Sequence, residues 1–504
     1  MSKKQSKKYT KKQKKGGEAL GAGSYGCVFR PTLKCKNSSK KFSGVSKLLV
    51  IEEARKEMII IENVMPIIKK IPNNKKYFIP NSEELFINCP VGELTQKDLK
   101  NSEKCTNFNQ QSYLTPGWIN TNKNKLSIIQ QSDGGEDFFK VITNLNLENF
   151  INEFSIITNK MIELIEYGIK PMHEKGLIHL DMKPPNLVYK VEKSDSFLRI
   201  IDWGFAIPTN NLPFNKILDT MISWTMMYNV PFSSILFDNK LIQYMNELIR
   251  GGMSNEKIAE VIYNKISKIP EPDGGHHEHI KKDINILYKS DENIQNLFIN
   301  YIKTILNKYK INNKFNAEKY FNEVYKENAD IYGLLTTYID IIKYIDIDKD
   351  ISRKIKLFIK KYLYSNEFAT TAYNIKELCD DMRDIISQGS PKPVINKGES
   401  PKPLANKEGS PNSSIYFTAE SLSQKTPPML SSPPLRERMK ALYISDDKID
   451  VFLKKLNKSG GKKTKKHKQK KHKKTNKKQK QTKKQKNKNT KKNIKKQLKK
   501  FIFK

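Results

Sequence analysis

The chain lacks long apolar runs, has few cysteines, and carries no acidic residue in the segments at its two ends. Apolar stretches such as residues 58–61 are cut short by charges, here by Glu62, so we expect no membrane insertion. The five cysteines, at positions 27, 35, 89, 105 and 379, form no Cys-x-x-Cys pair and follow no signal peptide. This pattern predicts an intracellular, reducing compartment, the cytoplasm or the nucleus.

The positive charge is concentrated near the ends of the chain. Residues 1–15 hold 8 lysines and residues 461–504 hold 23, so the residues between them carry only +8 of the net charge of +39. Like charges repel and almost nothing apolar can be buried, which predicts disordered tails over residues 1–16 and 457–504. Such tails bind nucleic acid or other polyanions by releasing counterions. A solubilising or targeting role without a dedicated partner explains the composition equally well.

A segment rich in proline and serine, residues 387–434, precedes the basic C-terminal tail. Ser-Pro pairs recur in it with a period of ten, at residues 390, 400 and 410. The composition predicts an extended, solvated linker. Its Ser-Pro units are either phosphate acceptors or parts of a plain spacer. A short helix is expected over residues 435–456, before the lysine run begins.

Two short motifs carry most of the functional information. Residues 179–186 contain an Asp-x-Lys-x-x-Asn pattern, and the apolar strand before Asp202 ends in Asp-Trp-Gly. Moving a phosphoryl group between oxygens requires a base that orients the incoming hydroxyl, a cation near the moving group, and hard oxygen ligands for magnesium. Asp181 is suited to the first role, Lys183 to the second, and Asn186 with Asp202 to the third.

With these residues the chain resembles the protein kinase superfamily, whose catalytic loop reads His-Arg-Asp-x-Lys-x-x-Asn and whose metal motif reads Asp-Phe-Gly. The resemblance implies an α+β, two-lobed fold with a small β-rich N-lobe, residues 17–131, and a large helical C-lobe with insertions, residues 132–386. It also implies ATP and Mg²⁺ as cofactors in the cleft between the lobes. Lys183 and Pro184 resemble the serine/threonine-specific form of the catalytic loop.

The resemblance extends to a glycine-rich segment near the start of the globular part. The matching residues are Leu20, Gly21, Ala22, Gly23, Ser24, Tyr25, Gly26, Cys27 and Val28. Dinucleotide-binding folds share the Gly-x-Gly-x-x-Gly pattern, but there a helix follows, whereas residues 27–29 form a run that predicts a second strand. We therefore expect a hairpin over the ATP phosphates, with Leu20 and Val28 against the adenine.

The next predicted strand, residues 44–50, contains a single lysine, Lys47. It is the candidate for the cation that pairs with the nontransferable phosphates of ATP. Its carboxylate partner should come from the following helix, where Glu57 is best placed beside apolar residues at helical spacing. Glu53 and Glu62 stay open as alternatives. Lys47 could also be a strand-edge lysine, with Glu57 on a solvated face.

Residues 126–137 predict a strand that runs into a flexible connection, the hinge of the family. Backbone groups of residues 131–133 would face the adenine edge, and the carboxylate of Asp137 could reach the ribose. The glycines in this segment are equally consistent with an ordinary surface turn.

The chain also departs from the family pattern. Leu180 replaces the arginine before the catalytic aspartate, which argues against control by phosphorylation of the activation loop. Trp203 replaces the phenylalanine of the metal motif, and no Ala-Pro-Glu follows, so residues 228–237 are expected to hold the substrate-docking strand and a helix start. The long span from Asp202 to Asp330 predicts inserted helices. These departures resemble kinases of iridoviruses and other large cytoplasmic DNA viruses, which implies a host cell, with packaging in the virion left open.

Other residues are expected to be structural. Asp330 lies in a segment that resembles the start of the central C-lobe helix and would anchor the catalytic loop; a helix N-terminal carboxylate is the alternative. An apolar stripe predicts a helix over residues 154–169 that stops at Pro171. His173 and His179 are expected to be packed and hydrogen-bonded. For residues 276–279, His-His-Glu-His, a solvated loop is favoured over a metal site.

The sequence thus predicts an ATP- and Mg²⁺-dependent protein serine/threonine kinase. Its partners would be proteins with serine or threonine acceptors, and its tails would contact polyanions. The alternative is a catalytically inactive pseudokinase scaffold whose tails bind nucleic acid. The joint retention of Lys47, Asp181, Asn186 and Asp202 favours the enzyme, because an inactive scaffold does not need all four.

Overall fold

The computed structural model describes the central part of the chain. The described residues are 17–23, 26–36, 42–81, 86–105, 114–192, 195–210, 212–221, 227–267, 276–288 and 293–387. The predicted tails, the proline- and serine-rich linker beyond residue 387 and the helix expected over residues 435–456 lie outside them, so these predictions stay open.

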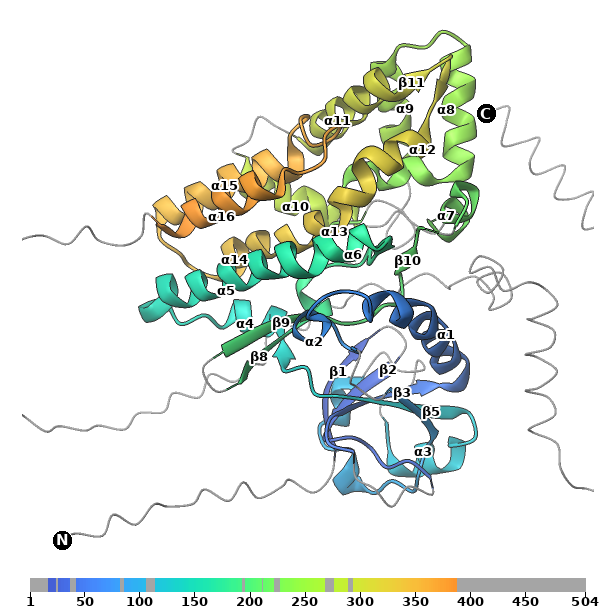
Figure 1. The fold of residues 1–504 in the computed structure, drawn as a ribbon, viewed down its shortest axis with the longest axis vertical. Helices are drawn as coiled ribbons and strands as arrows, with labels where there is room; N and C mark the ends of the chain where they lie inside the picture. The colour runs from blue at the N-terminus through green and yellow to red at the C-terminus, as the bar shows by residue number, and fades with distance from the viewer. Residues whose placement is uncertain are drawn as a thin grey trace, which may run out of the picture. The chain divides into compact units, whose positions relative to one another are not determined.

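The N-terminal region is built around a five-stranded antiparallel sheet (Figure 1). Its strands, in spatial order, are β1 (Glu18–Gly23), β2 (Gly26–Arg30), β3 (Val45–Val50), β5 (Leu126–Gln131) and β4 (Ile87–Pro90). Strands β1 and β2 form the hairpin that the glycine-rich segment predicts, with Gly23 opposite Gly26. Alternate residues of β2 and β3 face opposite sides of the sheet. Cys27, Phe29 and Leu48 therefore join one buried cluster, on the face away from Lys47.

Helix α1 (Ile51–Ile68) lies against β3 and β5 and contains Glu57. The sequence favours packing of α1 against the sheet because apolar residues recur along it at helical spacing. The buried ones are Ala54, Ile61, Val64 and Ile68. Two short helices, α2 (Asn74–Tyr77) and α3 (Pro116–Asn122), complete the region. Helix α3 begins where Thr115 accepts a hydrogen bond from the backbone N–H of Trp118.

A tight connection follows β5. At Gly135 the backbone φ is +120°, and a Cβ there would lie 2.2 Å from the carbonyl oxygen of Tyr189. Only glycine fits this position. The chain then forms β6 (Glu136–Asp137), which pairs with β8 (Leu187–Glu192), and β8 pairs in turn with β9 (Asp195–Ile200) in a small sheet. A separate pair joins β7 (Leu177–Ile178) to β10 (Ile207–Pro208).

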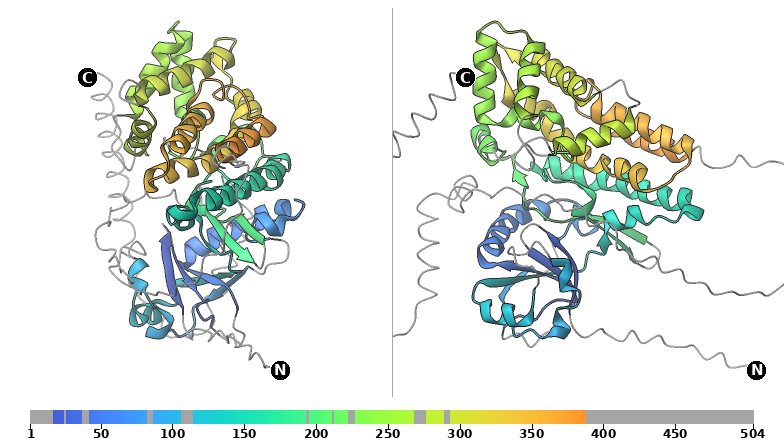
Figure 2. Two further views of the ribbon diagram at one scale, coloured as in Figure 1. Left: turned by 90° about the vertical axis from the view of Figure 1, so that its left-hand side faces the viewer. Right: turned by 180° about the vertical axis from the view of Figure 1, so that it is seen from behind.

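The remainder is helical, and two further views in Figure 2 show the same grouping of helices. The helices are α4 (Phe138–Thr143), α5 (Phe150–Leu164), α6 (Lys170–Glu174), α7 (Phe214–Met221), α8 (Asn239–Arg250), α9 (Asn255–Ile266), α10 (His277–Leu287), α11 (Ile294–Tyr309), α12 (Ala317–Tyr320), α13 (Lys326–Leu335), α14 (Thr337–Tyr344), α15 (Lys349–Tyr364) and α16 (Ile375–Ser387). Helix α13 is central, because all its residues from Asn328 to Leu335 are buried. Helices α7 to α12 occupy the span in which the sequence predicts insertions.

Three local predictions were wrong. The helix expected to stop at Pro171 continues to Glu174. A π-helical turn over Ile165–Ile169 places Pro171 in the first turn of α6, where the missing N–H of proline is least destabilising. The substrate-docking strand expected within residues 228–237 is absent from the described residues there, which instead form a 3₁₀ turn over Phe232–Phe237. The expected loop at residues 276–279 is mostly helix α10.

Four cysteines are joined in two disulfides, Cys27–Cys105 and Cys35–Cys89, and Cys379 is a buried free thiol. The sequence did not predict these pairs, whose members are 78 and 54 residues apart. The expected reducing compartment stays a prediction. Within the described part of the chain, no helix has both the length and the apolar character to span a membrane.

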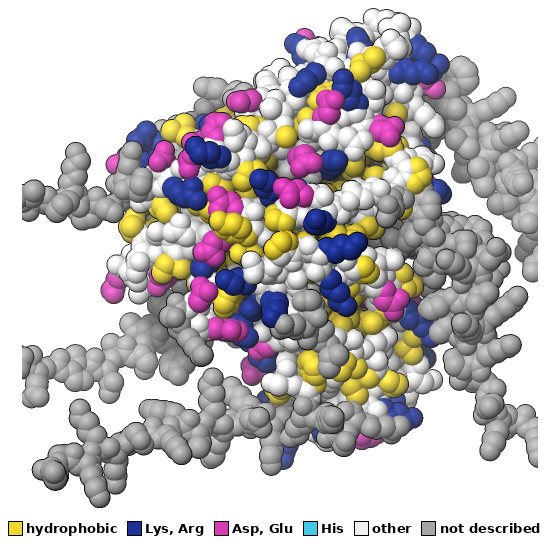
Figure 3. Space-filling view, viewed as in Figure 1, with side chains coloured by type: hydrophobic (Ala, Val, Ile, Leu, Met, Phe, Trp, Pro, Cys, Tyr) yellow, Lys and Arg dark blue, Asp and Glu magenta, His cyan; other side chains and the backbone are white. Residues whose placement is uncertain are grey.

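The described surface carries charges of both signs. In Figure 3, Lys and Arg side chains are interspersed with Asp and Glu side chains over the face shown. This mixture agrees with the modest net charge of the residues between the two lysine-rich ends.

Candidate active site

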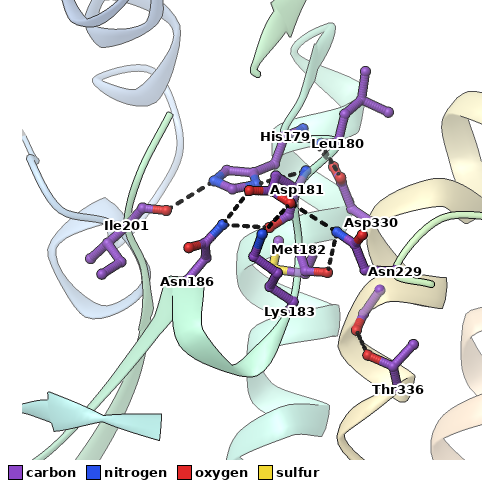
Figure 4. Close-up of polar contacts among 11 residues, drawn as sticks. His179, Leu180, Asp181, Met182, Lys183, Asn186, Ile201, Asn229, Asp330 and Thr336 are labelled. Atoms are coloured by element: carbon purple, nitrogen blue, oxygen red, sulfur yellow. Dashed lines mark hydrogen bonds and ion pairs between the residues drawn. The ribbon is translucent and has the colours of Figure 1, made fainter. Parts of the chain in front are cut away.

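The backbone of the segment that contains Asp181 is held by Asp330 from helix α13 (Figure 4). Its Oδ2 accepts from the backbone N–H of His179 at 2.8 Å, and its Oδ1 accepts from that of Leu180 at 2.6 Å. The Nε2 of His173 lies 2.9 Å from the same carboxylate. Burial alone would raise the pKa of Asp330, but His173 and the His179 N–H outweigh it and lower the pKa. The predicted anchor is confirmed, and the helix N-terminal alternative is wrong because Asp330 lies inside α13.

The carboxylate of Asp181 is surrounded by donors. The Nζ of Lys183 lies 2.8 Å from Oδ1, and the Nδ2 of Asn186 donates to Oδ2 at 2.7 Å and to the Asp181 backbone oxygen at 2.8 Å. Asp181 is only 5% exposed. The structure therefore brings together the base, the cation and the amide that the Asp-x-Lys-x-x-Asn pattern predicts.

Asn229 is a member of this cluster that the motifs did not reveal. Its Nδ2 donates to Oδ1 of Asp181 at 3.0 Å and to the backbone oxygen of Met182 at 3.3 Å, and the residue is fully buried. Asn229 lies 48 residues after Asp181, in the segment where the family pattern breaks down. A polar residue among apolar neighbours was the one signal for it, since Val230, Pro231 and Phe232 follow directly.

The catalytic segment also packs closely on helix α13 at Gly333. A Cβ at this position would lie 2.2 Å from the backbone oxygen of Met182 and 2.8 Å from that of Asn229. Only a glycine allows both backbones to approach the helix. Beside it, the hydroxyl of Thr336 donates to the Gly333 carbonyl at 2.7 Å (Figure 4).

Lys47 pairs with Glu57, as the sequence predicts. The Nζ of Lys47 lies 2.8 Å from Oε2 of Glu57, and both side chains are largely buried. The alternatives are excluded, because Glu53 pairs with Lys56 at 2.6 Å and Glu62 is exposed. Burial would lower the pKa of Lys47, but Asp202 and Glu57 outweigh it and raise that pKa, so the ammonium group stays charged.

Asp202 faces this same cation. Lys47 is the main reason why the pKa of Asp202 is lowered in spite of its burial, and Lys183 and His179 lower it further. The backbone of Asp202 has a φ of +60°, a left-handed conformation that aspartate tolerates better than most residues. Lys47 from β3 and Asp202 after β9 thus act on one another across 155 residues of sequence.

Trp203 fixes the turn that carries Asp202. Its Nε1 donates to the backbone oxygen of Ile79 at 2.8 Å, and its ring packs against Phe78 and His179. The residue is 2% exposed. A phenylalanine could fill the same space but could not donate this hydrogen bond.

The glycine-rich hairpin is next to β3 in the sheet, because its second strand, β2, pairs with β3. Val28 pairs with Lys47 across the strands, so both side chains lie on one face of the sheet. Cys27 points to the opposite face, where it is bonded to Cys105, so only its backbone can face a nucleotide. Leu20, Gly21, Ala22, Gly23 and Gly26 form the two strands of the hairpin, and Ser24 and Tyr25 lie outside the described residues.

The connection between β5 and β6 is held by Arg30 of β2. The Nη2 of Arg30 lies 2.7 Å from Oδ1 of Asp133 and also donates to the backbone oxygen of Gly135. Asp137 caps helix α4 by accepting the N–H of Phe139 at 2.9 Å. Burial raises the pKa of Asp137. The predicted ribose contact of Asp137 stays a prediction beside this observed capping role.

The histidines are structural. The Nε2 of His179 lies 3.0 Å from the backbone oxygen of Ile201, and His173 contacts Asp330, as expected. On helix α10, His279 lies 3.2 Å from Asp283. Within the described ranges, no group of three or more His, Cys, Asp or Glu side chains is arranged to hold a metal ion.

The donor set suits a magnesium nucleotide. With its nitrogen bonded to Asp181, Asn186 keeps its amide oxygen, and Asp202 adds an ionised carboxylate. Both are hard oxygen ligands of the kind that Mg²⁺ prefers. Lys47 supplies the positive charge that phosphates require.

Comparisons with known proteins agree with this geometry. The model of the family described as "Protein kinase domain" matches residues 15–231. Calcium-dependent protein kinase 5 of Plasmodium berghei is 33% identical over 79 residues, which cover 16% of this chain and 13% of the relative. Calcium-dependent protein kinase 3 of Plasmodium yoelii yoelii is 25% identical over 200 residues, 39% of this chain and 28% of the relative. The chain thus spans between 13% and 28% of the length of these relatives.

Proposed function

We propose that the chain is a protein serine/threonine kinase. The match of the protein kinase domain family to residues 15–231, together with the β-sheet N-terminal region and the helical C-terminal region, supports this proposal. The chain would transfer the γ-phosphoryl group of ATP to serine and threonine hydroxyls of proteins. The observation that carries the proposal is the convergence of Lys47 and Asp202 with the Asp181 cluster. Lys47 and Lys183 both act on Asp202, and Lys183 also contacts Asp181.

Each side chain has a task in this reaction. Asp181 accepts the proton of the incoming hydroxyl and orients its oxygen toward the phosphorus. Lys183, 2.8 Å from Asp181, offsets negative charge on the moving group. Lys47, held by Glu57, binds the phosphates that are not transferred. Asn186 and Asp202 would hold Mg²⁺, which neutralises charge between the β- and γ-phosphates when it is bound.

Asp330, Asn229 and Trp203 act through these residues. Asp330 fixes the backbone before Asp181, and Asn229 fixes the carboxylate of Asp181. Trp203 fixes the turn of Asp202. Positioning of this kind lowers the barrier because the groups need not reorganise during the reaction. A catalytically silent scaffold would not require so many contacts around one carboxylate, so the pseudokinase alternative is not favoured.

Serine/threonine specificity rests on the form of the catalytic loop, in which Lys183 and Pro184 follow the aspartate. Phosphoamino-acid analysis of proteins labelled with γ-³²P-ATP tests it. We expect phosphoserine and phosphothreonine, none of which forms with the Asp181→Asn variant. Label on tyrosine alone would refute the specificity and leave the kinase assignment intact.

Leu180 bears on regulation. It takes the place of an arginine, is fully buried and has a φ of +60°. An apolar side chain there cannot pair with a phosphorylated activation loop. We therefore propose activity without loop phosphorylation, and phosphatase treatment of the purified protein should not reduce it.

The lysine-rich tails and a viral origin are further parts of the proposal. Composition supports both, and the departures from the family pattern also support the viral origin. Removing residues 461–504 should abolish salt-sensitive retention on DNA and leave catalysis unchanged. Unaltered retention would exclude a polyanion-binding role for this segment.

A further inference from the structure

We propose that the Cys27–Cys105 pair is a redox-sensitive site that controls how tightly the glycine-rich hairpin closes on the nucleotide. This inference rests on the proposed function, because it assigns a regulatory site to the ATP lid. It does not depend on which protein is phosphorylated.

Cys27 belongs to the lid itself. It follows Gly26 in β2 and pairs with Ala22 of β1, one position from the Gly23–Gly26 pair. Cys105 ends a 3₁₀ turn over Ser102–Cys105, and the two Cα atoms are 5.6 Å apart. The bond therefore ties the start of β2 to a segment that lies outside the hairpin.

The bond acts from the far side of the sheet. Cys27 lies opposite Leu48 and faces the buried cluster that contains Phe29 and Cys105, whereas Val28 lies opposite Lys47. The disulfide thus restrains β2 without occupying the nucleotide face. A lid held in this way has less conformational freedom to lose when ATP binds, so the oxidised protein should bind ATP more tightly.

The rest of the lid has independent attachments. The N–H of Ala19 donates to the Lys100 carbonyl at 2.8 Å, and the N–H of Lys100 donates to the Gly17 carbonyl at 3.1 Å. These bonds hold the base of β1 and do not need the disulfide. Reduction should therefore loosen the start of β2 while the base of β1 stays paired.

The second disulfide provides a matched control. Cys35 lies beyond the end of β2, bridges to Val91, and is bonded to Cys89 of β4. This bond joins the sheet five residues past Arg30, away from the glycine turn. It should contribute to stability without setting the ATP affinity.

The chemistry is thiol–disulfide exchange. A dithiol reductant attacks one sulfur through its thiolate, and its second thiol resolves the mixed disulfide, so two electrons and two protons pass to Cys27 and Cys105 while the reductant becomes a disulfide. Glutathione disulfide reverses the reaction. In reducing compartments, disulfides are usually transient or redox-sensing, and such a compartment is what the sequence predicts.

Because both cysteines are buried, thiol–disulfide exchange at Cys27 and Cys105 depends on movement of the hairpin. Cys27 is 0% exposed and Cys105 1% exposed, so a reductant reaches their sulfurs only when the hairpin separates from the 102–105 segment. A nucleotide that keeps the lid closed should slow the reduction. If ATP also favours the disulfide form at equilibrium, linkage requires that reduction weakens ATP binding by the same factor.

The test uses the full chain, first exposed to glutathione disulfide and then treated with dithiothreitol. Thiols are counted under denaturing conditions, and the Kd for ATP is measured by calorimetry before and after reduction. We expect one free thiol before reduction, Cys379, and a Kd for ATP that is about 5- to 150-fold higher after it. Saturating ATP should slow the reduction of Cys27–Cys105, followed by mass spectrometry of alkylated peptides.

Two double variants separate the bonds. Cys27→Ser/Cys105→Ser should bind ATP weakly with or without reductant, whereas Cys35→Ser/Cys89→Ser should bind tightly and keep the redox response. If the first variant does not fold, the comparison of reduced and oxidised wild type decides.

Five free thiols after oxidation, or equal ATP affinity in the two states, would overturn the redox site while leaving the kinase assignment standing. Failure of the oxidised wild type to bind ATP would instead overturn the proposed function, and this inference with it.

Discussion

The Nδ2 of Asn229 donates a hydrogen bond to Oδ1 of Asp181 at a distance of 3.0 Å, and Lys183 contacts the same oxygen. The two residues belong to segments that no sequence motif connects. The Asn229 side chain is neutral, so it fixes the orientation of Asp181 without competing for the proton that Asp181 would accept in the proposed reaction.

Removing this bond should slow catalysis without weakening nucleotide binding. For Asn229→Ala we expect kcat to fall about 10- to 100-fold, because the base loses its alignment, while KM for ATP stays within twofold. Steady-state kinetics with varied ATP measure both constants. Asn229→Ser, which keeps a donor, should recover part of the loss. An unchanged kcat in the alanine variant would remove Asn229 from the mechanism.

A carboxylate at the same position should shift the pH profile. In Asn229→Asp two carboxylates would lie within hydrogen-bond distance, and the repulsion between like charges would disfavour ionisation of both at once. The base must be ionised to accept a proton, so the acid limb of kcat should move to higher pH and activity should recover as the pH increases. A profile that is uniformly lowered, with no displaced limb, would indicate a structural defect only.

The Lys47–Glu57 pair should affect kcat/KM far more than the Lys56–Glu53 pair on the same helix. Glu57→Gln removes the charge that lies 2.8 Å from the Lys47 ammonium group and should reduce kcat/KM about 10- to 100-fold. Glu53→Gln breaks an i,i+3 pair with Lys56 and should change it less than twofold. Equal effects of the two substitutions in the same phosphotransfer assay would contradict the assigned role of Glu57.

Trp203→Phe should destabilise the protein because it leaves the buried oxygen of Ile79 without its donor. We expect a loss of about 1–3 kcal/mol in the free energy of unfolding, measured by denaturant titration. Trp203→Ala, which also empties the space between Phe78 and His179, should cost more, about 3–5 kcal/mol. If Trp203→Phe were as stable as wild type, the hydrogen bond would not hold the Asp202 turn.

Asp340 on α14 should make stability fall as the pH rises. Burial, and then the neighbouring Asp283, raise its pKa to about 7. The unfolded carboxyl releases its proton near pH 4, about three pH units earlier. The folded state therefore loses stability relative to the unfolded chain between about pH 4 and pH 7.

Asp340→Asn should relieve this loss. We expect a gain of about 1–4 kcal/mol at pH 8 and no gain at pH 4, from thermal unfolding at both values. The exposed Asp346→Asn is the control and should change stability at neither pH. A gain of equal size at both pH values would show that the charge of Asp340 is not the cause.

The sequence predicted the parts of the site that depend on local spacing. Asp181, Lys183 and Asn186 lie within six residues, and Lys47 and Glu57 are separated by one strand end and two helical turns. Residue type and order were sufficient to predict that these side chains lie in one site. The β1–β2 hairpin could likewise be distinguished from a strand–helix unit, because residues 27–29 favour a strand.

What the sequence did not predict depends on contacts between distant segments. Asn229 reaches Asp181 only after the chain has folded back over 48 residues, and the disulfide partners are 54 and 78 residues apart. Pairing of cysteines cannot be deduced from spacing alone. The continuation of the helix past Pro171 was missed because periodicity does not reveal a π-helical turn.

Asp181 is proposed to lie in a site that transfers phosphate from ATP to protein hydroxyls. The most direct measurement is the transfer of ³²P from γ-labelled ATP to basic proteins by wild type and by Asp181→Ala, with ATP binding measured in parallel. We predict that the variant binds ATP and loses about 10²- to 10⁴-fold in transfer rate. Equal labelling by the two proteins would contradict the account.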